Sequence, residues 1–246
     1  MTYCVGLKLD RGLVFMSDTR TNAGVDNISV FRKMVLWEAE GERSLTLMTA
    51  GNLATTQAVV SLLNERAKPM DERGQPSILE APSMFQAARL VGETLREVIR
   101  SQAGGGGPEA EATFSATMIL GGQVRGGEPR LFLIYPEGNF VEASADTPFF
   151  QIGETKYGRP ILVRAYDPAM GFADAVKLMM LSFDSTIKAN LSVGLPLDMH
   201  VYEADTFRHG LRRRIEVGDA YFEEISSGWG EALRAAVQNL PSYRLD

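Results

Sequence analysis

The spacing of apolar positions changes in blocks along the chain, from the two-residue period of strands to the longer period of helices. The first block contains four predicted strands, at residues 2–9, 13–18, 28–37 and 44–49. The second of these is an almost unbroken apolar run, which predicts burial on both of its faces. A polar loop is expected over residues 19–27, between the second strand and the third.

Two helices follow the first block, and blocks of strands and helices then repeat. The two helices are predicted over residues 53–66 and 83–101, where apolar residues recur every three or four positions, and Ser83 is a suitable N-cap for the second. The next block holds predicted strands at residues 114–120, 130–135, 139–142 and 149–152. The last block holds helices from about residue 156 and over residues 173–191, strands at residues 199–204 and 206–217, and a closing helical region over residues 220–240 that is interrupted near Gly228.

The grouping of strands into blocks distinguishes between fold classes. Strands that alternate singly with helices would predict a doubly wound parallel sheet, whereas blocks of strands predict antiparallel pairing. We therefore expect an α+β fold in which two antiparallel sheets stack face to face, with helix pairs on both outer faces. The glycine-rich run at residues 104–107 is expected to be a flexible linker or exposed loop. Because no complete core precedes this run, we expect a single domain over residues 1–246.

Composition and charge argue against several classes of function. The 246 residues carry a formal net charge of −6 and no basic cluster, so we expect no nucleic-acid partner. No apolar run approaches the roughly 20 residues that span a bilayer, and no signal peptide is apparent, so we expect a cytoplasmic protein without a membrane partner. Cys4 is the only cysteine, and we expect it to be a small buried residue. Two histidines are too few for a histidine-rich metal site, and we expect His200 to be a hydrogen-bonded structural residue.

Thr2 directly follows the initiator methionine and begins the first predicted strand. Removal of Met1 would leave a threonine with a free α-amine beside its own hydroxyl. A hydroxyl is a weak nucleophile at neutral pH and needs a base within hydrogen-bond reach. An α-amine, with an ordinary pKa of roughly 7.7–8.0, can be that base, so one residue would supply both groups. Many proteins begin with Met-Thr, so the alternative is an N-terminus without a catalytic role.

Charged residues near the ends of two strands could complete such a site. Lys33 lies in an apolar stretch and must be paired if it is buried, because an isolated buried charge is very costly. Asp18, at the end of the second strand, is the nearest plausible partner. If both lie beside Thr2, the Lys33 ammonium would favour the ionised hydroxyl and Asp18 would neutralise the lysine. The Ala50-Gly51-Asn52 turn leads into a helix and would present backbone N–H groups to an oxyanion. A strand-to-strand ion pair without a catalytic role is the alternative.

Four segments of the first part of the chain together resemble one enzyme family. They are Thr-Tyr-Cys-Val at residues 2–5, Ser-Asp-Thr-Arg at 17–20, Phe-Arg-Lys at 31–33 and Thr-Ala-Gly-Asn at 49–52. In these segments the chain is similar to the proteasome β-subunit family of N-terminal-nucleophile (Ntn) hydrolases, and in particular to its bacterial branch called Anbu, the ancestral β-subunit. The resemblance covers nearly the whole chain. It implies a four-layer αββα sandwich, which agrees with the order of the predicted elements.

The resemblance also implies roles for individual positions. Thr2 takes the place of the nucleophile and its amine that of the base, while Asp18 and Lys33 match the family's charged pair. Arg20 matches the supporting basic residue beside the aspartate, and Gly51 matches the glycine whose N–H stabilises the oxyanion. This chemistry requires no metal and no organic cofactor. Since family members assemble into rings or spirals, we expect a homo-oligomer, with a regulator as a further possible partner.

Two segments depart from the pattern of the family. Where catalytic proteasome subunits carry Gly-Ser-Gly, this chain has Gly-Glu-Thr at residues 153–155, so that Glu154 replaces a serine that helps to orient the threonine amine. Glu154 could accept the proton of the amine or raise its pKa, which would alter or weaken catalysis. The family's Arg-Asp…Ser-Gly-Gly segment is represented loosely by residues 190–194, in which Ser192 can be aligned and the aspartate has no clear counterpart.

The sequence therefore predicts a proteasome-type threonine peptidase that cleaves peptide or protein substrates through an acyl-enzyme. With no long propeptide before Thr2, removal of Met1 by methionine aminopeptidase would be the only activation step. Two alternatives remain at this stage. One is an assembly-forming scaffold whose site is weak or vestigial, and the other is an Ntn hydrolase for small amides or short peptides.

Overall fold

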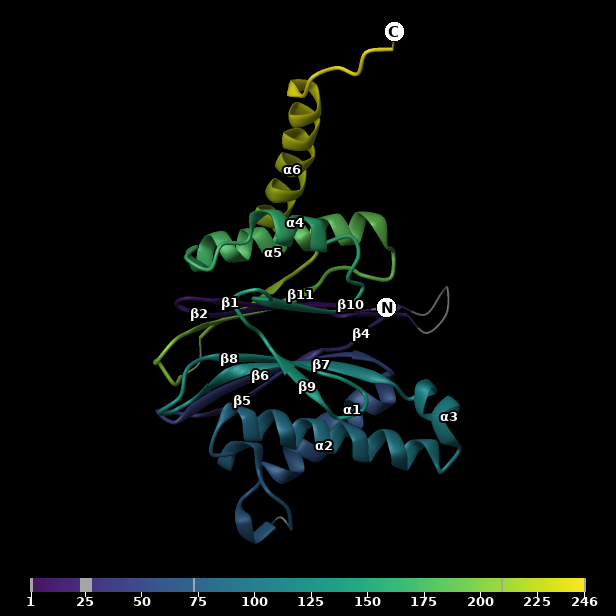
Figure 1. Ribbon diagram of the computed structural model, residues 1–246, viewed down its shortest axis with the longest axis vertical. Helices are drawn as coiled ribbons and strands as arrows, with labels where there is room; N and C mark the ends of the chain where they lie inside the picture. Colours follow the sequence, from purple (N-terminus) through teal and green to yellow (C-terminus); the bar gives the residue numbers. More distant parts are fainter. Residues whose placement is uncertain (1, 23–27, 73, 209, 246) are drawn as a thin grey trace.

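The computed structural model describes residues 2–22, 28–72, 74–208 and 210–245. Two five-stranded antiparallel sheets lie face to face in the middle of the molecule, and helices cover the outer face of each sheet (Figure 1). The α+β class and the αββα order of layers are therefore confirmed. Both sheets are open, and a separate two-stranded ribbon extends from the end at which the N-terminus lies.

The first sheet places the N-terminal strand between two neighbours. Its strands are, in order, β10 (Phe149–Gly153), β1 (Tyr3–Leu9), β2 (Gly12–Asp18), β11 (Leu197–Glu203) and β12 (Leu211–Ile215). Every residue of β2 is buried, as its apolar run predicts. Tyr3 pairs with Gly153 across β1 and β10, so Thr2 lies directly beside the end of β10. Helices α4 (Arg159–Ala165) and α5 (Phe172–Ala189) cover the outer face of this sheet (Figure 1).

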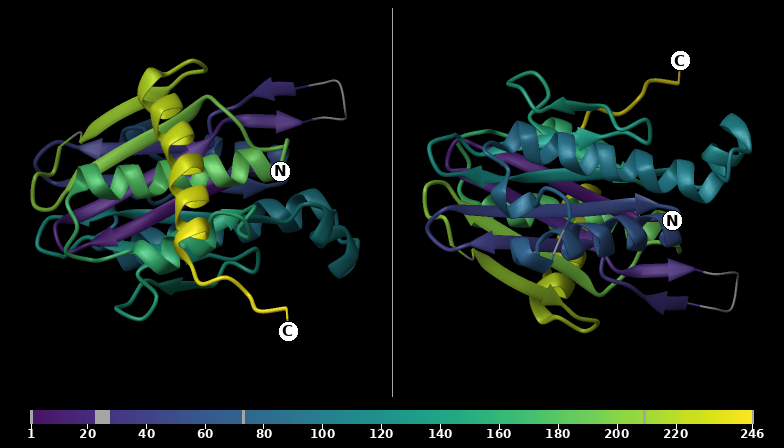
Figure 2. Two further views of the ribbon diagram at one scale, coloured as in Figure 1. Left: turned by 90° about the horizontal axis from the view of Figure 1, so that it is seen from above. Right: turned by 90° about the horizontal axis from the view of Figure 1, so that it is seen from below.

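The second sheet contains the strands that come from the middle of the chain. Its strands are, in order, β5 (Met34–Ala39), β6 (Arg43–Gly51), β7 (Ala116–Val124), β8 (Arg130–Ile134) and β9 (Phe140–Glu142). Helices α1 (Leu53–Arg66) and α2 (Met84–Ala103) cover it, as Figure 2 shows from below. The predicted N-cap of α2 is confirmed, because the Ser83 hydroxyl accepts a hydrogen bond from the N–H of Gln86 at 3.2 Å. The segment between α1 and α2 contains two short 3₁₀ helices, Met70–Glu72 and Ile78–Glu80.

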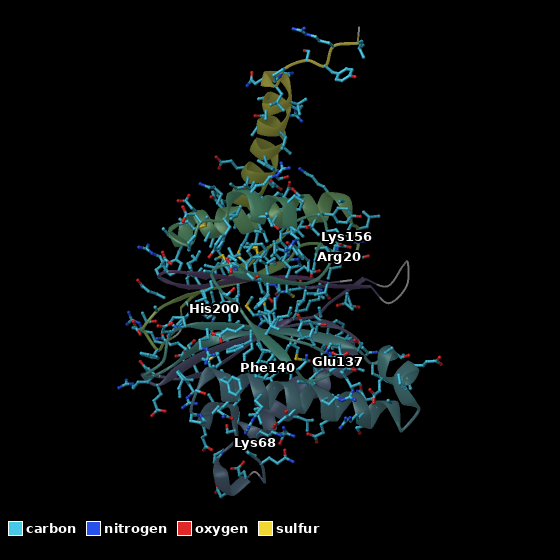
Figure 3. All side chains as sticks on the ribbon, in the orientation of Figure 1. Arg20, Lys68, Glu137, Phe140, Lys156 and His200 are labelled. Atoms are coloured by element: carbon cyan, nitrogen blue, oxygen red, sulfur yellow. The ribbon has the colours of Figure 1, made fainter. Side chains whose placement is uncertain are left out.

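Apolar side chains from both sheets fill the layer between them. Leu13 and Phe15 of β2 pack there with Met48, Ile119 and other residues of the second sheet. His200 is fully buried in this layer, where its Nδ1 lies 2.8 Å from the hydroxyl of Thr46 (Figure 3). The expectation that this histidine is a hydrogen-bonded structural residue is therefore confirmed.

The predicted strand over residues 28–37 and the loop before it are corrected by the structure. Residues 28–30 form β4 (Ile28–Val30), which pairs with β3 (Arg20–Asn22) inside the predicted polar loop, while residues 34–39 form β5 in the second sheet. The loop residues 23–27 lie outside the described residues. The strand breaks at residues 31–33 because the chain passes there from one set of backbone partners to another. Lys33 therefore lies in a connection between strands and not within a strand.

Two further segments differ from their predicted form. The glycine-rich run is an exposed loop over residues 104–106, but residues 107–113 form the short helix α3 (Gly107–Thr113), with Pro108 in its first turn. Helix α6 (Ala220–Asn239) runs without interruption through Gly228, and it projects away from the layers along the long axis of the molecule (Figure 1). Trp229 holds α6 against α5, since its indole N–H donates to the Ser185 hydroxyl at 3.3 Å. Throughout the described ranges, no helix is both long and apolar enough to cross a bilayer.

Candidate active site

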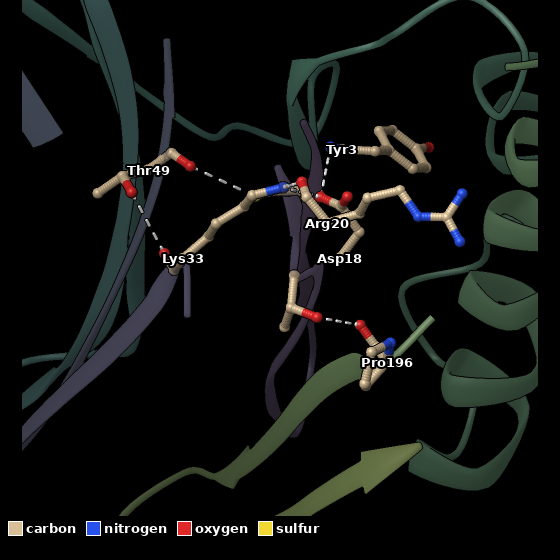
Figure 4. Close-up of polar contacts among 8 residues, drawn as sticks. Tyr3, Asp18, Arg20, Lys33, Thr49 and Pro196 are labelled. Atoms are coloured by element: carbon tan, nitrogen blue, oxygen red, sulfur yellow. Dashed lines mark hydrogen bonds and ion pairs between the residues drawn. The ribbon is translucent and has the colours of Figure 1, made fainter. Parts of the chain in front are cut away.

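The structure joins Asp18 and Lys33 in a buried ion pair beside the N-terminal strand. Asp18 ends β2, and its Oδ1 accepts hydrogen bonds from the Lys33 ammonium at 2.7 Å and from the N–H of Tyr3 at 2.9 Å (Figure 4). The Lys33 ammonium also donates to the backbone carbonyl of Arg20 at 2.6 Å. The side chains of Lys33 and Asp18 are 6% and 0% exposed. The charged pair expected from the sequence is therefore formed, next to the residue that follows Thr2.

The backbone of Lys33 is fixed in the second sheet while its ammonium reaches the first. The Lys33 carbonyl accepts a hydrogen bond from the N–H of Thr49 in β6 at 2.9 Å. On the preceding side, the N–H of Phe31 donates to the carbonyl of Thr19 at 2.8 Å. The lysine side chain therefore bridges the two sheets, and its position depends on both of them.

Burial dominates the electrostatics of Asp18. Removal from water raises the pKa of its carboxyl above the usual value, while the charge of Lys33 and the hydrogen bonds from Lys33 and Tyr3 act in the opposite direction. Both strong hydrogen bonds are accepted by Oδ1, and Oδ2 has no hydrogen-bond partner among the described residues. The carboxylate is thus only partly compensated, and the charge of Lys33 is the largest influence that favours its ionised form.

Thr2 is held through its backbone by the end of β10. Its carbonyl accepts a hydrogen bond from the N–H of Glu154 at 2.6 Å. Gly153 has a φ of +82°, and a Cβ at this position would lie 1.9 Å from the Thr2 carbonyl oxygen. Only glycine therefore allows β10 to approach the N-terminus this closely. The side chain of Thr2 is partly exposed and lines a cleft of about 730 Å³.

Gly51 lines the same cleft at the junction of β6 and α1. Its φ is +118°, and a Cβ there would lie 2.5 Å from the carbonyl oxygen of Ser115. The next N–H group, that of Asn52, donates to the Ser115 carbonyl at 2.9 Å. The expectation that the whole turn presents N–H groups to an oxyanion is therefore wrong for Asn52, whose side chain instead caps α1 by accepting from the N–H of Thr55.

Glu154 lies in a chain of hydrogen bonds that ends at Ser192. It is 8% exposed, and its two oxygens accept from the backbone N–H of Lys156 at 3.2 Å and from the side-chain amide of Asn190 at 3.0 Å. The Asn190 side-chain oxygen in turn accepts from the backbone N–H of Ser192 at 2.9 Å. The structure thus joins the two departures from the family pattern through Asn190, to which the sequence assigned no role.

Arg20 bonds the same loop, and its side chain makes no hydrogen bond or ion pair with Asp18. Its guanidinium donates to the carbonyl of Leu191 at 2.9 Å and lies against Gly194, where a Cβ would be 2.3 Å from the guanidinium carbon. The neighbouring Thr19 hydroxyl donates to the carbonyl of Pro196 at 2.7 Å. The residues between α5 and β11 are therefore attached to the end of β2 from which the ion pair extends.

A second buried network lies beside the N-terminal strand, and it could not be predicted from the sequence. The Tyr3 hydroxyl accepts from the Gln151 side-chain amide at 2.6 Å and lies 2.7 Å from the Ser182 hydroxyl, which donates to the Gly158 carbonyl. Burial raises the pKa of Tyr3 to about 12. The alternation of residues in β1 predicts that Tyr3 lies on the same buried face as Val5 and Leu7. Its hydrogen-bond partners come from β10 and α5, and no local sequence pattern identifies them.

Cys4 and the acidic residues complete the description of the site. Cys4 is fully buried, as expected, and burial raises the pKa of its thiol, so it has neither the access nor the ionisation of a nucleophile. In the part of the chain that the structure describes, no group of three or more histidine, cysteine or acidic side chains could hold a metal ion.

Comparison with known proteins relates this arrangement to one family. The family model described as "Proteasome subunit" matches residues 2–199. Among solved structures, Anbu (ancestral beta-subunit) from Yersinia bercovieri is 47% identical with a TM-score of 0.92, and 100% of each chain is covered. An Anbu (Gly-1) mutant from Hyphomicrobium sp. strain MC1 is 50% identical with a TM-score of 0.91, again over 100% of both chains.

A third solved structure, the helical assembly of the Anbu complex from Pseudomonas aeruginosa, is 44% identical with a TM-score of 0.90 over 99% of both chains. The comparison with curated proteins returned no match. The family model covers well over half of the chain, and the full-length structural likenesses agree with it. The chain therefore belongs to the proteasome subunit family and has the fold of a proteasome-like Ntn hydrolase.

Proposed function

We propose that residues 1–246 act as one domain with threonine peptidase activity, in which removal of Met1 frees the α-amine of Thr2. The Thr2 hydroxyl attacks the carbonyl of a scissile amide, and its proton passes to the α-amine. The amine then protonates the departing amino group, which leaves an ester between substrate and Thr2. Water hydrolyses this ester with the same amine as base, and Gly51 supplies an N–H to the oxyanion in both steps.

One observation carries this proposal: the buried pair of Asp18 and Lys33 is attached to the N–H of Tyr3, immediately after Thr2. A buried ion pair is weak evidence for stability, because the cost of desolvation offsets much of the attraction. A positive charge held beside an N-terminal hydroxyl has a clear chemical use, since it favours the ionised form of that hydroxyl. The pair therefore supports catalysis better than a purely structural role.

The surroundings of the site suggest the setting in which it works. A structural relative from Pseudomonas aeruginosa is described as a helical assembly, and we propose a homo-oligomer, as a ring or spiral, for this chain also. Contacts that repeat from head to tail give either closed rings or open helices, so a single chain is compatible with both. We propose a cytoplasmic protein that acts on peptide or protein substrates, with a regulator as an additional partner.

The environment of Glu154 favours a second candidate function, an assembly-forming scaffold with a weak site. One carboxylate oxygen accepts from the backbone N–H of Lys156 and the other from the side-chain amide of Asn190. The backbone N–H of Glu154 bonds the Thr2 carbonyl, so the carboxylate is fixed on a residue that contacts Thr2. A fixed negative charge there would stabilise the protonated amine and so reduce the fraction of the amine that is free to accept a proton at neutral pH. Activity of the Glu154→Gln variant above that of the unsubstituted protein would favour this reading of the site.

The test of the peptidase is substitution at Thr2 in protein whose intact mass shows that Met1 has been removed. Thr2→Ala should abolish hydrolysis of an unfolded protein and of short peptide amides, while Thr2→Ser, which keeps hydroxyl and amine, should retain part of it. An epoxyketone probe, which needs both groups, should label the unsubstituted protein and not Thr2→Ala. Unchanged hydrolysis by Thr2→Ala would exclude Thr2 as the nucleophile.

A further inference from the structure

The cleft beside Thr2 has an uneven distribution of charge. Among the described residues that line it, the charged ones are Lys33 and Arg32, and none is acidic. The charge of Lys33 is already neutralised by Asp18 at 2.7 Å. Arg32 is exposed and makes no hydrogen bond or ion pair with the described part of the chain. The walls of the cleft therefore have one positive charge that has no hydrogen-bond or ion-pair partner among the described residues.

The position of Arg32 is fixed even though its side chain is exposed. It lies between Phe31, whose N–H is bonded to Thr19, and Lys33, whose carbonyl is bonded to Thr49. One acidic residue, Asp198, feels the charge of Arg32. Burial raises the pKa of Asp198 above its usual value, while the charge of Arg214, which lies 3.7 Å away, and more weakly that of Arg32 act in the opposite direction. Asp198 therefore lies closer to Arg214 than to Arg32, and it forms no ion pair with the Arg32 guanidinium.

The remaining walls of the cleft suit a short aliphatic chain that ends in a polar group. Val35, Leu53 and Val60 supply apolar surface, and Thr21, Thr56 and Gln57 supply hydrogen-bonding groups. A glutamate side chain has two methylene groups before its carboxylate, so it can contact the apolar wall and still reach a guanidinium. Carboxylates pair with arginine through two parallel hydrogen bonds, which adds direction to the attraction.

We propose that Arg32 selects substrates in which a glutamyl residue supplies the carbonyl that Thr2 attacks. This inference rests on the proposed peptidase function and names the substrate class of the same cleft. Arg32 contacts the substrate carboxylate and does not take part in bond cleavage. A lysine in the same position of the substrate is repelled by Arg32, since no acidic side chain among the described lining residues is present to receive it.

The test uses peptides that are blocked at both ends, so that the side chain is their only source of a carboxylate. Peptides with Glu, Gln, Leu or Lys before the scissile bond are compared by kcat/KM. The Glu peptide should be cleaved about tenfold faster than the Gln peptide, the scale of one charged hydrogen bond. Arg32→Gln should remove this preference, and Arg32→Glu should transfer it to the Lys peptide. Arg89→Gln, which removes another exposed arginine that lies in α2 and is paired with Glu93, is the matched control for the loss of one positive charge and should keep the preference for Glu.

The outcomes separate this inference from the proposed function. Cleavage of the Leu or Lys peptide at least as fast as the Glu peptide leaves the peptidase intact and overturns the role of Arg32. If no peptide is cleaved and the epoxyketone probe leaves Thr2 unlabelled, the peptidase proposal fails. In that case, the affinities of the Glu and Gln peptides for the Thr2→Ala variant test whether Arg32 binds the glutamyl carboxylate. Tighter binding of the Glu peptide that disappears in the Thr2→Ala, Arg32→Gln double variant supports the site, and equal binding of both peptides overturns it.

Discussion

Two carboxylate–cation pairs in this molecule have similar contacts and opposite electrostatics. Asp18 and Lys33 form a pair whose side chains are 0% and 6% exposed, beside the N-terminus. Glu142 and Arg130 form a pair between β8 and β9 whose side chains are 35% and 31% exposed, and two nitrogens of the arginine bond the two carboxylate oxygens. The pKa of Asp18 is raised, because burial is the largest influence on it. The pKa of Glu142 is lowered, because the hydrogen bond from Arg130 is the largest influence on it.

The difference shows that a short contact alone does not tell what an ion pair contributes. The outer pair remains in contact with water, so it has little desolvation cost and little net effect. The inner pair has lost its water, so each charge depends on the other, and removal of one leaves the other uncompensated. A pair of the second kind is retained where its charge has a chemical use, which agrees with the place of Lys33 beside Thr2.

The largest expected effect comes from separating the inner pair. Lys33→Ala should reduce the free energy of unfolding by about 3–5 kcal/mol, because it leaves the Asp18 carboxylate buried without a counter-charge. Urea unfolding of the two single variants and of the double variant Asp18→Asn, Lys33→Ala gives the coupling between them. The double variant should recover part of the loss of Lys33→Ala in stability while remaining without peptidase activity. A coupling close to zero would mean that the pair is not mutually dependent.

The second expected effect is a pH dependence of opposite sign for the two carboxyls. Because the folded pKa of Asp18 is raised, its contribution to stability is complete below the unfolded value of about 3.9 and declines as pH rises through the folded pKa. Because the folded pKa of Glu142 is lowered, its contribution is complete above about 4.3 and is lost as pH falls through the folded pKa.

Two isosteric variants make this difference measurable. From about pH 3 to pH 6, which spans the ordinary carboxyl range, Asp18→Asn should gain stability relative to the unsubstituted protein as pH rises, whereas Glu142→Gln should lose it. Urea unfolding at several pH values gives both slopes in the same buffers. Slopes of the same sign would show that Lys33 outweighs burial at Asp18.

The comparison also explains how far the sequence could predict the fold. Both long strands at the N-terminus and helix α1 follow from local periodicity, and the helix was predicted with the bounds Leu53–Arg66 that the structure has. The break at residues 31–33 could not be predicted locally, because it depends on which distant strands β4 and β5 pair with. The uninterrupted course of α6 through Gly228 likewise involves a tertiary contact, that of Trp229 with Ser185.

The candidate site was predictable to the extent that its residues look unusual in their local sequence. Asp18 and Lys33 stand out as charges among apolar residues, and their pairing follows from the cost of leaving either one alone. The bonds that connect Glu154 to Asn190, and Tyr3 to Gln151, join segments far apart in the chain. No pattern of spacing specifies such partners, since ordinary polar residues at these positions are equally compatible with a solvated surface.

The smallest expected effect concerns the outer pair and depends on salt. A cycle of Arg130→Ala and Glu142→Ala should give a coupling of about 0.2–1 kcal/mol, because both side chains remain in contact with water. Added salt should reduce this coupling, since exposed charges are screened, and should affect the inner pair much less. The same urea measurements at low and high ionic strength test both pairs in one protein. A coupling of several kcal/mol at the outer pair, insensitive to salt, would show that direct bonding and not burial determines the strength of these pairs, and the inner pair would then no longer need a chemical role to explain it.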